Sequence, residues 1–205
     1  MSTSTSSVPS FLRTRLLAVA LAAGGAGFGA ASITTDPVTT SAPEILLAME
    51  LGAHYEGIRF TPYQDAGGVW TVCRGITGAT VRRGKTYTEA ECSQLELTHY
   101  QKIEREAKQL YTHWSEYNIW VRASMLDMLY NLGSNQVRQS SHRKLANAGD
   151  LSGACQQMTH WVWGRDARTG QKVQWNGLVK RRASTAELCS DWGRDGHFSS
   201  VVNQS

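Results

Sequence analysis

A mainly apolar run without a charged residue lies close to the N-terminus of the chain. It runs from Leu16 to Ile33, spans 18 residues and is preceded by Arg13 and Arg15. A helix needs about 20 mainly apolar residues to cross a bilayer, so this run is at the lower limit of a membrane span. Basic residues stay on the cytoplasmic side of such a span. The pattern therefore predicts that the N-terminal segment enters a membrane and that the rest of the chain is exported.

The composition of this run weakens its preference for a membrane. Eleven of its 18 residues are Gly or Ala, which bury little apolar area, and Gly also lowers helix stability. Three interpretations remain: an anchor that enters the bilayer and later leaves it, a secretory signal cleaved near Ala30 or Ala31, and a permanent anchor. We favour a releasable anchor at 16–33, with a disordered cytoplasmic tail at 1–15 and a linker at 34–42.

From residue 43 to residue 193, the hydrophobic pattern predicts one α+β, mostly helical domain. Pro62, Gly67 and Gly68 break up a short polar and aromatic stretch, which is typical of strands and turns. Thr88 and Glu91 form a capping box that begins a helix. The helices are expected at 43–56, 88–111, 119–130, 150–161 and 177–192, the strands within 58–72, a polar loop from 163 to 173 and a disordered tail at 194–205. A small lobe with strands is therefore expected to precede a helical lobe.

Composition narrows the class of protein. The 205 residues carry a net charge of +4, with 19% charged and 41% hydrophobic residues, and all 17 acidic residues lie from Asp36 onward. These values exclude a wholly disordered chain and a protein with many membrane spans. The Lys and Arg residues form no long block, so we expect no nucleic-acid partner.

Four cysteines, Cys73, Cys92, Cys155 and Cys189, are present in the exported part of the chain. An even number of cysteines in an exported chain favours disulfides, and three pairings are possible. We favour Cys73–Cys92 and Cys155–Cys189, because each pair stays within one predicted lobe. Neither CxxC nor HExxH occurs, so we predict no metal and no cofactor.

The candidate chemistry lies where the first domain helix ends. Glu56 closes that helix, Asp65 follows in a glycine-rich turn, and Thr71 lies on the next predicted strand. Cleavage of a glycosidic bond needs one carboxylic acid to protonate the leaving oxygen and a second polar group to hold water or stabilise positive charge. The three residues therefore suit glycoside hydrolysis, while the alternative that they are ordinary surface and turn residues stays open on this pattern alone.

This stretch resembles the phage lysozyme or endolysin family, glycoside hydrolase family 24. The family signature is a Glu, eight residues, an Asp, five residues and a Thr, and Glu56, Asp65 and Thr71 match it without a gap. The similarity extends to the segments Thr86-Tyr-Thr-Glu-Ala-Glu-Cys92, Leu129-Tyr-Asn-Leu-Gly133, Asn147-Ala-Gly-Asp150 and Gly177-Leu-Val-Lys-Arg-Arg182. The resemblance implies a lysozyme-like, two-lobed fold preceded by a signal-anchor helix.

The resemblance also implies an activity and a set of roles. The enzyme would be an N-acetylmuramidase that cuts peptidoglycan between N-acetylmuramic acid and N-acetylglucosamine. Glu56 would be the general acid, and Asp65 and Thr71 would position the water, which implies inversion and carboxyl groups about 6.5–9.5 Å apart. Asn131 resembles a substrate-binding position, and Arg181 or Arg182 would pair with Glu56 or bind substrate.

The Gly/Ala-rich N-terminus resembles the signal-anchor-release segments of some family members. It implies export by the host secretion machinery, tethering on the periplasmic side of the host inner membrane, and release into the periplasm once a holin collapses the membrane potential. We expect a monomer that causes host cell lysis.

One position departs from the family pattern, and two other functions remain open. Many members have a His after the Gly that follows the Thr, whereas this chain has Ile76 after Gly75, so no role is carried over to residue 76. A lytic transglycosylase would also use one Glu but would leave an anhydro sugar and would not need Asp65 or Thr71. The other alternative is a non-enzymatic, wall-binding accessory of lysis.

Overall fold

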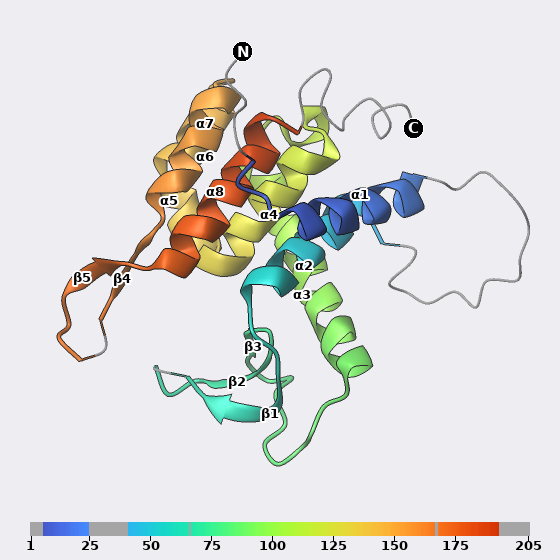
Figure 1. Cartoon of the computed structure of the whole chain (residues 1–205), viewed down its shortest axis with the longest axis vertical. Helices are drawn as coiled ribbons and strands as arrows, with labels where there is room; N and C mark the ends of the chain where they lie inside the picture. Colours follow the sequence, from blue (N-terminus) through green and yellow to red (C-terminus); the bar gives the residue numbers. More distant parts are fainter. Residues whose placement is uncertain (1–5, 25–40, 66, 167, 193–205) are drawn as a thin grey trace, which may run out of the picture.

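The computed structural model describes residues 6–24, 41–65, 67–166 and 168–192. The fold is mostly helical with small antiparallel sheets, as the sequence predicts (Figure 1). The helices are α1 (Ser10–Gly24), α2 (Pro43–Tyr55), α3 (Glu89–Leu110), α4 (Ile119–Leu132), α5 (Ser134–Gln139), α6 (Ser141–Asn147), α7 (Leu151–Gln157) and α8 (Asn176–Ser190), with 3-10 turns η1 (Trp114–Glu116) and η2 (Met158–His160). The strands are β1 (Arg59–Gln64), β2 (Trp70–Cys73), β3 (Ile76–Thr77), β4 (Trp163–Arg165) and β5 (Lys172–Gln174).

Local sequence signals explain where the long helices begin. Pro43 occupies the first turn of α2, where its missing N–H costs no hydrogen bond. Thr88 caps α3 through the predicted capping box: Glu91 N donates to Thr88 Oγ1 at 3.2 Å, and Thr88 N donates to Glu91 Oε2 at 2.9 Å. Asn118 caps α4 by accepting from two backbone N–H groups. Three of the predicted helices are therefore found close to their expected starts.

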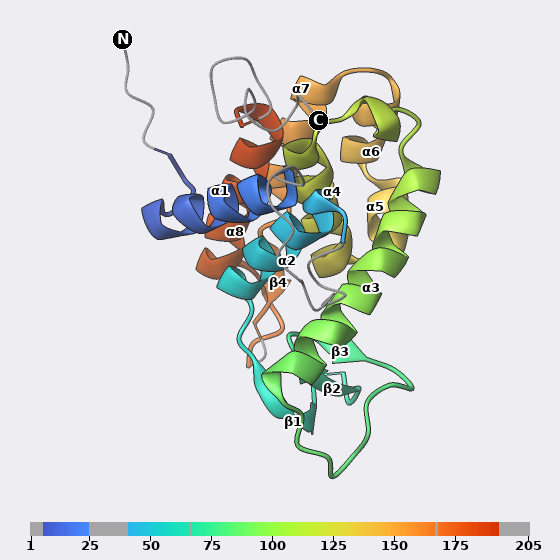
Figure 2. The same cartoon turned by 90° about the vertical axis from the view of Figure 1, so that its right-hand side faces the viewer.

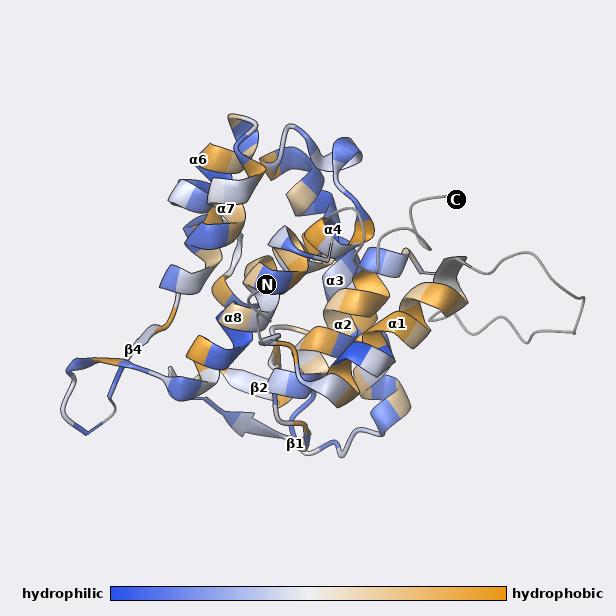
Figure 3. Ribbon diagram, turned by 45° about the horizontal axis from the view of Figure 1, so that its top comes forward, coloured by the Kyte–Doolittle hydropathy of each residue, from blue (hydrophilic) through white to orange (hydrophobic). Residues whose placement is uncertain are grey.

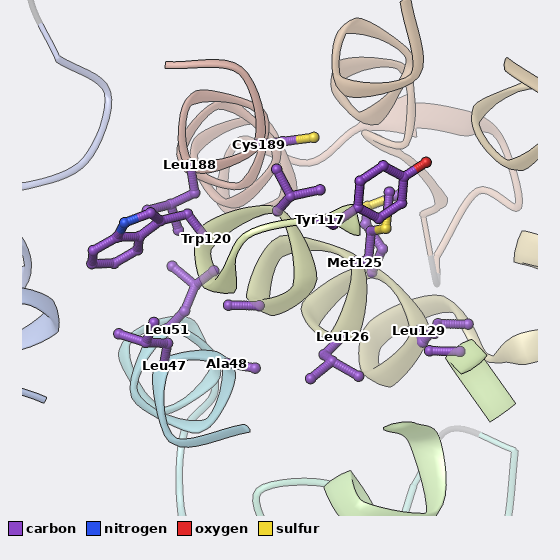
Figure 4. Packing of buried hydrophobic residues seen from close by; sticks show 14 of the residues in the cluster. Leu47, Ala48, Leu51, Tyr117, Trp120, Met125, Leu126, Leu129, Leu188 and Cys189 are labelled. Atoms are coloured by element: carbon purple, nitrogen blue, oxygen red, sulfur yellow. The ribbon is translucent and has the colours of Figure 1, made fainter. Parts of the chain in front are cut away.

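Helix α4 lies at the centre of the main hydrophobic core. Its Met125 and Leu126 are completely buried, and Figure 4 shows Leu47 and Leu51 of α2 and Leu188 of α8 pointing toward it from two sides. Because α2 and α8 pack on the same helix, side chains that project from their ends can meet although they are distant in sequence.

The small lobe is a three-stranded antiparallel sheet in the order β1-β2-β3. Figure 2 shows α3 running from this sheet to the helical lobe. A second, smaller core holds the sheet, built from Val72, Cys73, Ile76, Tyr87 and Cys92. Ile76, the residue that departs from the expected pattern, is 4% exposed and packs in this core.

The two disulfides are those that the sequence favoured. Cys73–Cys92 joins the end of β2 to the first turn of α3, and Cys155–Cys189 joins α7 to α8. Closing loops of this size limits the freedom of the unfolded chain, which in the entropy model is worth about 3 kcal/mol for each bridge.

The N-terminal boundaries differ from the prediction. Helix α1 begins at Ser10 rather than at Leu16, within the stretch expected to be a disordered tail. Val8, Leu12, Leu16 and Ala20 are at most 1% exposed and belong to the main core. Positions four residues apart share one face of a helix, and this face packs on α2; Figure 3 shows the two helices side by side. Burial of this face explains why the helix begins before the apolar run, on its N-terminal side.

The expected anchor is only partly described. Residues 25–33 and the linker at 34–40 lie outside the described residues, as does the tail at 194–205. Within the described part of the chain, no helix is both long and apolar enough to cross a membrane.

Glu187 of α8 holds the residues that precede α1. Its Oε2 accepts hydrogen bonds from the backbone N–H of Ser7 at 2.6 Å and of Val8 at 3.2 Å, and its Oε1 accepts from Ser6 Oγ and from Trp192 Nε1. Burial alone raises the pKa of Glu187, but these hydrogen bonds outweigh burial and lower the pKa below its usual value. The N-terminal segment is therefore joined to α8 by a charged acceptor as well as by apolar contacts.

The segment after Trp163 is a β-hairpin, not the polar loop that was expected. Strands β4 and β5 pair from Trp163↔Gln174 to Arg165↔Lys172. Asp166 Oδ1 accepts from Thr169 N at 2.7 Å, and Gly170 adopts a φ of 70°, which favours glycine. The strands are short and polar, so neither gives the alternating apolar pattern that identifies a strand in a sequence.

Packing of α1 can be tested with two leucines of the same helix. Leu16→Ala should lower the free energy of unfolding of the soluble full chain by about 2–5 kcal/mol, because it removes a buried side chain from the core. Leu21→Ala is the control, since Leu21 is 53% exposed, and should change that free energy by less than about 0.5 kcal/mol. Urea titration measures both values. Equal, small losses would contradict the packing of α1 on α2.

Candidate active site

Glu56 lies at the point where the helical lobe leads into the sheet. It is the residue after α2, and its backbone N–H donates to Gly52 O at 2.9 Å, which ends the helix. Gly52 is required by a close approach, because a Cβ at this position would lie 2.7 Å from Tyr100 Oη. The Glu56 side chain is 31% exposed and its Oε1 pairs with Arg181 Nη1. No described residue donates to Oε2, so this oxygen is available to a ligand.

Asp65 follows β1 and shapes the turn into β2. Its Oδ1 accepts hydrogen bonds from Gly67 N and Val69 N, both at 2.9 Å. These two N–H groups hold the carboxylate in one orientation, with Oδ2 unpaired among the described residues. The turn thus leaves one carboxylate oxygen free to accept a proton from water.

Thr71 lies on β2, in register with Tyr63 of β1 and Thr77 of β3. It is 4% exposed, and its Oγ1 donates to Val69 O at 3.1 Å. A hydroxyl that donates one hydrogen bond keeps its lone pairs as acceptors. Val69 N donates to the Asp65 side chain and Val69 O accepts from the Thr71 side chain. The backbone of this one residue therefore fixes the position of the two side chains relative to each other.

Arg181 is held by a buried carboxylate that the sequence analysis did not single out. Asp127 of α4 is completely buried, and its Oδ1 accepts from Arg181 Nε at 3.1 Å and from Nη2 at 2.7 Å. Its Oδ2 accepts from Arg182 Nη2 and Thr185 Oγ1, both at 3.0 Å. Burial raises the pKa of Asp127, but the two arginines and Thr185 outweigh burial and lower it. Asp127 therefore fixes both arginines at the junction of α4 and α8.

A second set of contacts joins the sheet to the helical lobe beneath the site. Tyr130 of α4 donates its hydroxyl to Arg74 O, next to the end of β2. The Arg74 guanidinium in turn donates to both oxygens of Glu96 at 3.1 Å. Burial raises the pKa of Glu96, against the opposing effect of Arg74. These contacts hold β2, and with it Thr71, at a defined position relative to α4.

The predicted substrate-binding residues differ in their accessibility. Asn131, in the last turn of α4, is partly exposed. Arg181 and Arg182 are only 2% and 0% exposed, and Asp127 pairs with both. This arrangement favours a structural role for Arg182 and an action of Arg181 through Glu56 rather than direct contact with a ligand.

The missed residue Asp127 had a signal in the sequence. It is the single acidic residue of α4, with apolar residues at Met125, Leu126, Met128 and Leu129 on either side. An isolated charge in such a helix is buried only when it is paired. The pattern could have indicated a buried ion pair, but it contains no information on which cation of the chain is the partner.

Comparison with known proteins identifies the family of this chain. The family model described as phage lysozyme matches residues 53–185. A SAR-endolysin of Enterobacteria phage P21 is 37% identical over 141 residues, which cover 68% of this chain and 79% of the relative. A SAR-endolysin of Escherichia phage Mu is 31% identical over 192 residues, which cover 92% of this chain and 96% of the relative.

Solved structures show the same fold. The active form of the P1 phage endolysin Lyz superposes with a TM-score of 0.61 at 22% identity, and the match covers 89% of this chain and 97% of that chain. The muramidase domain of SpmX from Asticaccaulis excentricus superposes with a TM-score of 0.63 at 24% identity, and covers 69% of this chain and 93% of that domain. Because the family model covers most of the chain and the two SAR-endolysins are more than 30% identical over at least two thirds of it, the chain belongs to the phage lysozyme family.

Proposed function

We propose that this protein is an exported endolysin that hydrolyses the β-1,4 bond between N-acetylmuramic acid and N-acetylglucosamine in peptidoglycan. The observation that carries the proposal is the state of the two carboxylates. Glu56 and Asp65 are each held through one oxygen, and each keeps the other oxygen unpaired among the described residues. Two carboxyl groups prepared in this way match the acid and the base of glycoside hydrolysis.

In the proposed reaction, Glu56 donates a proton to the glycosidic oxygen as the bond from that oxygen to the anomeric carbon breaks. A water molecule attacks the anomeric carbon from the opposite face and gives a proton to Asp65 Oδ2, which inverts the configuration. Thr71 Oγ1 accepts the second water hydrogen, because its own hydrogen is directed at Val69 O. Glu56 and Asp65 then exchange protons with solvent before the next cycle.

Arg181 has a positioning role in this proposal. Its guanidinium is anchored on Asp127 through Nε and Nη2, so that only Nη1 is directed at Glu56. An anchored, planar guanidinium restricts the orientation of the carboxylate that it meets. Of the three predicted substrate-binding residues, Asn131 on α4 is then the one proposed to contact the sugar directly.

We also propose that the N-terminal segment has two states, one inserted in the membrane and one packed on the enzyme. Before lysis it lies in the host inner membrane and holds the enzyme on the periplasmic side; after the membrane potential collapses, it leaves the bilayer and α1 packs on α2. The SAR-endolysin relatives support this proposal, as does the apolar face of α1, which is completely buried in the folded chain. The weak apolarity of 11 Gly or Ala among residues 16–33 makes the exchange between bilayer and protein feasible.

The experiment that tests the activity is mass spectrometry of peptidoglycan digested with the full chain. The full chain is used because α1 contributes to the main core. Saturated disaccharide–peptide fragments with N-acetylmuramic acid at the reducing end are expected. Anhydromuramic ends would instead show a transglycosylase and would remove the water-positioning roles of Asp65 and Thr71. Binding to the wall with no fragments at all would show a non-enzymatic accessory protein.

The release proposal predicts the effect of a more apolar anchor. Replacing Gly24, Gly25, Gly27 and Gly29 with Leu adds apolar area to the run, so the protein should remain in the membrane fraction and should not lyse cells after the membrane potential is collapsed. The same four positions changed to Ala form the control, which should still be released. Cell fractionation before and after addition of an uncoupler measures both. Release of the Leu variant would contradict the proposal.

A further inference from the structure

We propose that the hairpin formed by β4 and β5 is a second binding surface for the peptidoglycan strand, beside the catalytic residues. The proposal rests on the proposed muramidase function and adds to it a recognition element outside the Glu56, Asp65 and Thr71 group. The first observation is the exposure of Trp163 and Trp175, each 50% exposed, whereas Trp120 and Trp192 are completely buried in the core.

One face of the hairpin combines an aromatic ring with charged and amide groups. Trp163 pairs with Gln174 and Arg165 pairs with Lys172, so that these four side chains share one face of the two-stranded ribbon. All four are exposed, and Lys172 Nζ lies 5.1 Å from the centre of the Trp163 ring. This face therefore presents a flat apolar ring flanked by two cations.

The structure holds this face in place although it forms no part of the core. On the opposite face, Trp175 lies against Gly164, where an added Cβ would be 2.7 Å from the indole ring. At the tip, Asp166 accepts from Arg168 N, Thr169 N and Thr169 Oγ1. A two-stranded hairpin is marginally stable by itself, so these contacts are what keep Trp163 oriented toward solvent.

The position of the hairpin connects it to the catalytic residues. Trp175 precedes the first residue of α8, and six residues of helix, about 9 Å of rise, separate it from Arg181, which contacts Glu56. Figures 1 and 3 show that the β4–β5 hairpin extends to the same side of the molecule as the β1–β2 hairpin, which carries Asp65. A polymer bound at Glu56 can therefore continue onto the β4–β5 hairpin.

The chemistry of this face matches a peptidoglycan strand. Indole offers a flat apolar surface with a polar edge, which suits the apolar face of a sugar ring. Arg165 and Lys172 suit the carboxylates of the stem peptides, because a charged donor and a carboxylate form strong hydrogen bonds. A Trp with basic residues also suits the surface of an anionic membrane, but the continuity with the catalytic residues favours the glycan.

Binding without turnover provides the test. In a Glu56→Gln background of the full chain, co-sedimentation with purified peptidoglycan should show that Trp163→Ala weakens binding about three- to tenfold. Trp163→Phe should restore most of the affinity, because it keeps an aromatic face. The combined change Arg165→Ala and Lys172→Ala should weaken binding and reduce its dependence on salt. Lys144→Ala, an exposed cation on α6, is the control and should leave binding unchanged.

The possible results separate this inference from the proposed function. Unchanged binding of Trp163→Ala, with a parent protein that binds and cuts peptidoglycan, would overturn the role of the hairpin alone. If the hairpin variants lost binding to vesicles of anionic phospholipid but still bound peptidoglycan like the parent, the hairpin would be assigned to the membrane. That result would also overturn the inference. A parent chain that neither binds nor cuts peptidoglycan would overturn the proposed function itself. Equal melting temperatures of the variants would confirm that the fold is retained.

Discussion

Glu56→Gln should lower the rate of wall hydrolysis by at least about 10²–10⁴-fold, because the amide has no proton to give to the leaving oxygen. Stability should change little, since Arg181 keeps its bonds to Asp127. Turbidity of a suspension of purified walls measures the rate. The control is Glu50→Gln, which changes the same residue type within α2 and also removes an ion pair with an arginine, Arg15; it should retain activity.

Asp65→Asn and Thr71→Ala extend this prediction to the water. Asp65→Asn removes the proton acceptor but keeps an oxygen for the turn, so a loss of activity with a retained fold is expected. Thr71→Ala removes one contact to the water and should cost less than Asp65→Asn. Full activity of both variants would contradict hydrolysis by an inverting mechanism and would favour transglycosylation. Full activity of Glu56→Gln would contradict the assignment of the general acid.

Asp127→Ala is expected to have the largest effect on stability. It leaves the guanidinium groups of Arg181 and Arg182 buried without their shared carboxylate, and loss of one partner of a buried ion pair costs about 3–5 kcal/mol. For a chain of this size, that corresponds to a decrease of roughly 6–20 °C in melting temperature. Calorimetry of the full chain measures it. Asp191→Ala, an exposed carboxylate at the end of α8, is the control and should change the melting temperature little.

The lowered pKa of Asp127 adds a dependence on pH. In the folded chain its pKa lies below the usual value of 3.8, so the folded state binds protons less readily than the unfolded state. The contribution of Asp127 to stability is therefore complete above about pH 4 and is lost as the pH falls further toward the folded pKa. Asp127→Asn should flatten this part of the stability profile. An unchanged acid limb in that variant would show that Asp127 does not contribute to it.

Loss of Asp127 should also affect activity through Arg181. Without Asp127, no described residue accepts a hydrogen bond from Nε or Nη2 of Arg181, and the guanidinium that meets Glu56 becomes free to turn. The sequence alone predicted neither the contact of Asp127 with Arg181 nor the burial of Arg182. Both depend on packing of α4 against α8, which brings together residues more than 50 positions apart.

Several features followed from local sequence because their causes are local. The capping box of Thr88 and Glu91, the start of α2 at Pro43 and the turn around Asp65 each depend on hydrogen bonds within a few residues. For the same reason the spacing of Glu56, Asp65 and Thr71 could be recognised in one continuous stretch. The lobes predicted from these elements also led to the disulfide pairing that the structure has.

Other features depended on contacts between distant parts of the chain. The run of residues 16–33 predicts an anchor or a cleaved export signal, yet the face of α1 that carries Leu12 and Leu16 packs on α2, and Glu187 holds the residues before it. A hydrophobic face indicates that burial occurs but does not identify what covers it, since lipid and protein are both apolar.

The β4–β5 hairpin and the Asp127 network show the same limit for polar residues. Residue types and their spacing along the chain indicated the helix starts and the candidate acid and base. It did not specify that Asp127 would be shared by two arginines or that Trp163 would face solvent beside Lys172. The pairing energy of a charge or an aromatic ring depends on which groups the fold brings within a few ångströms and how far it removes them from water, and only the folded chain determines both.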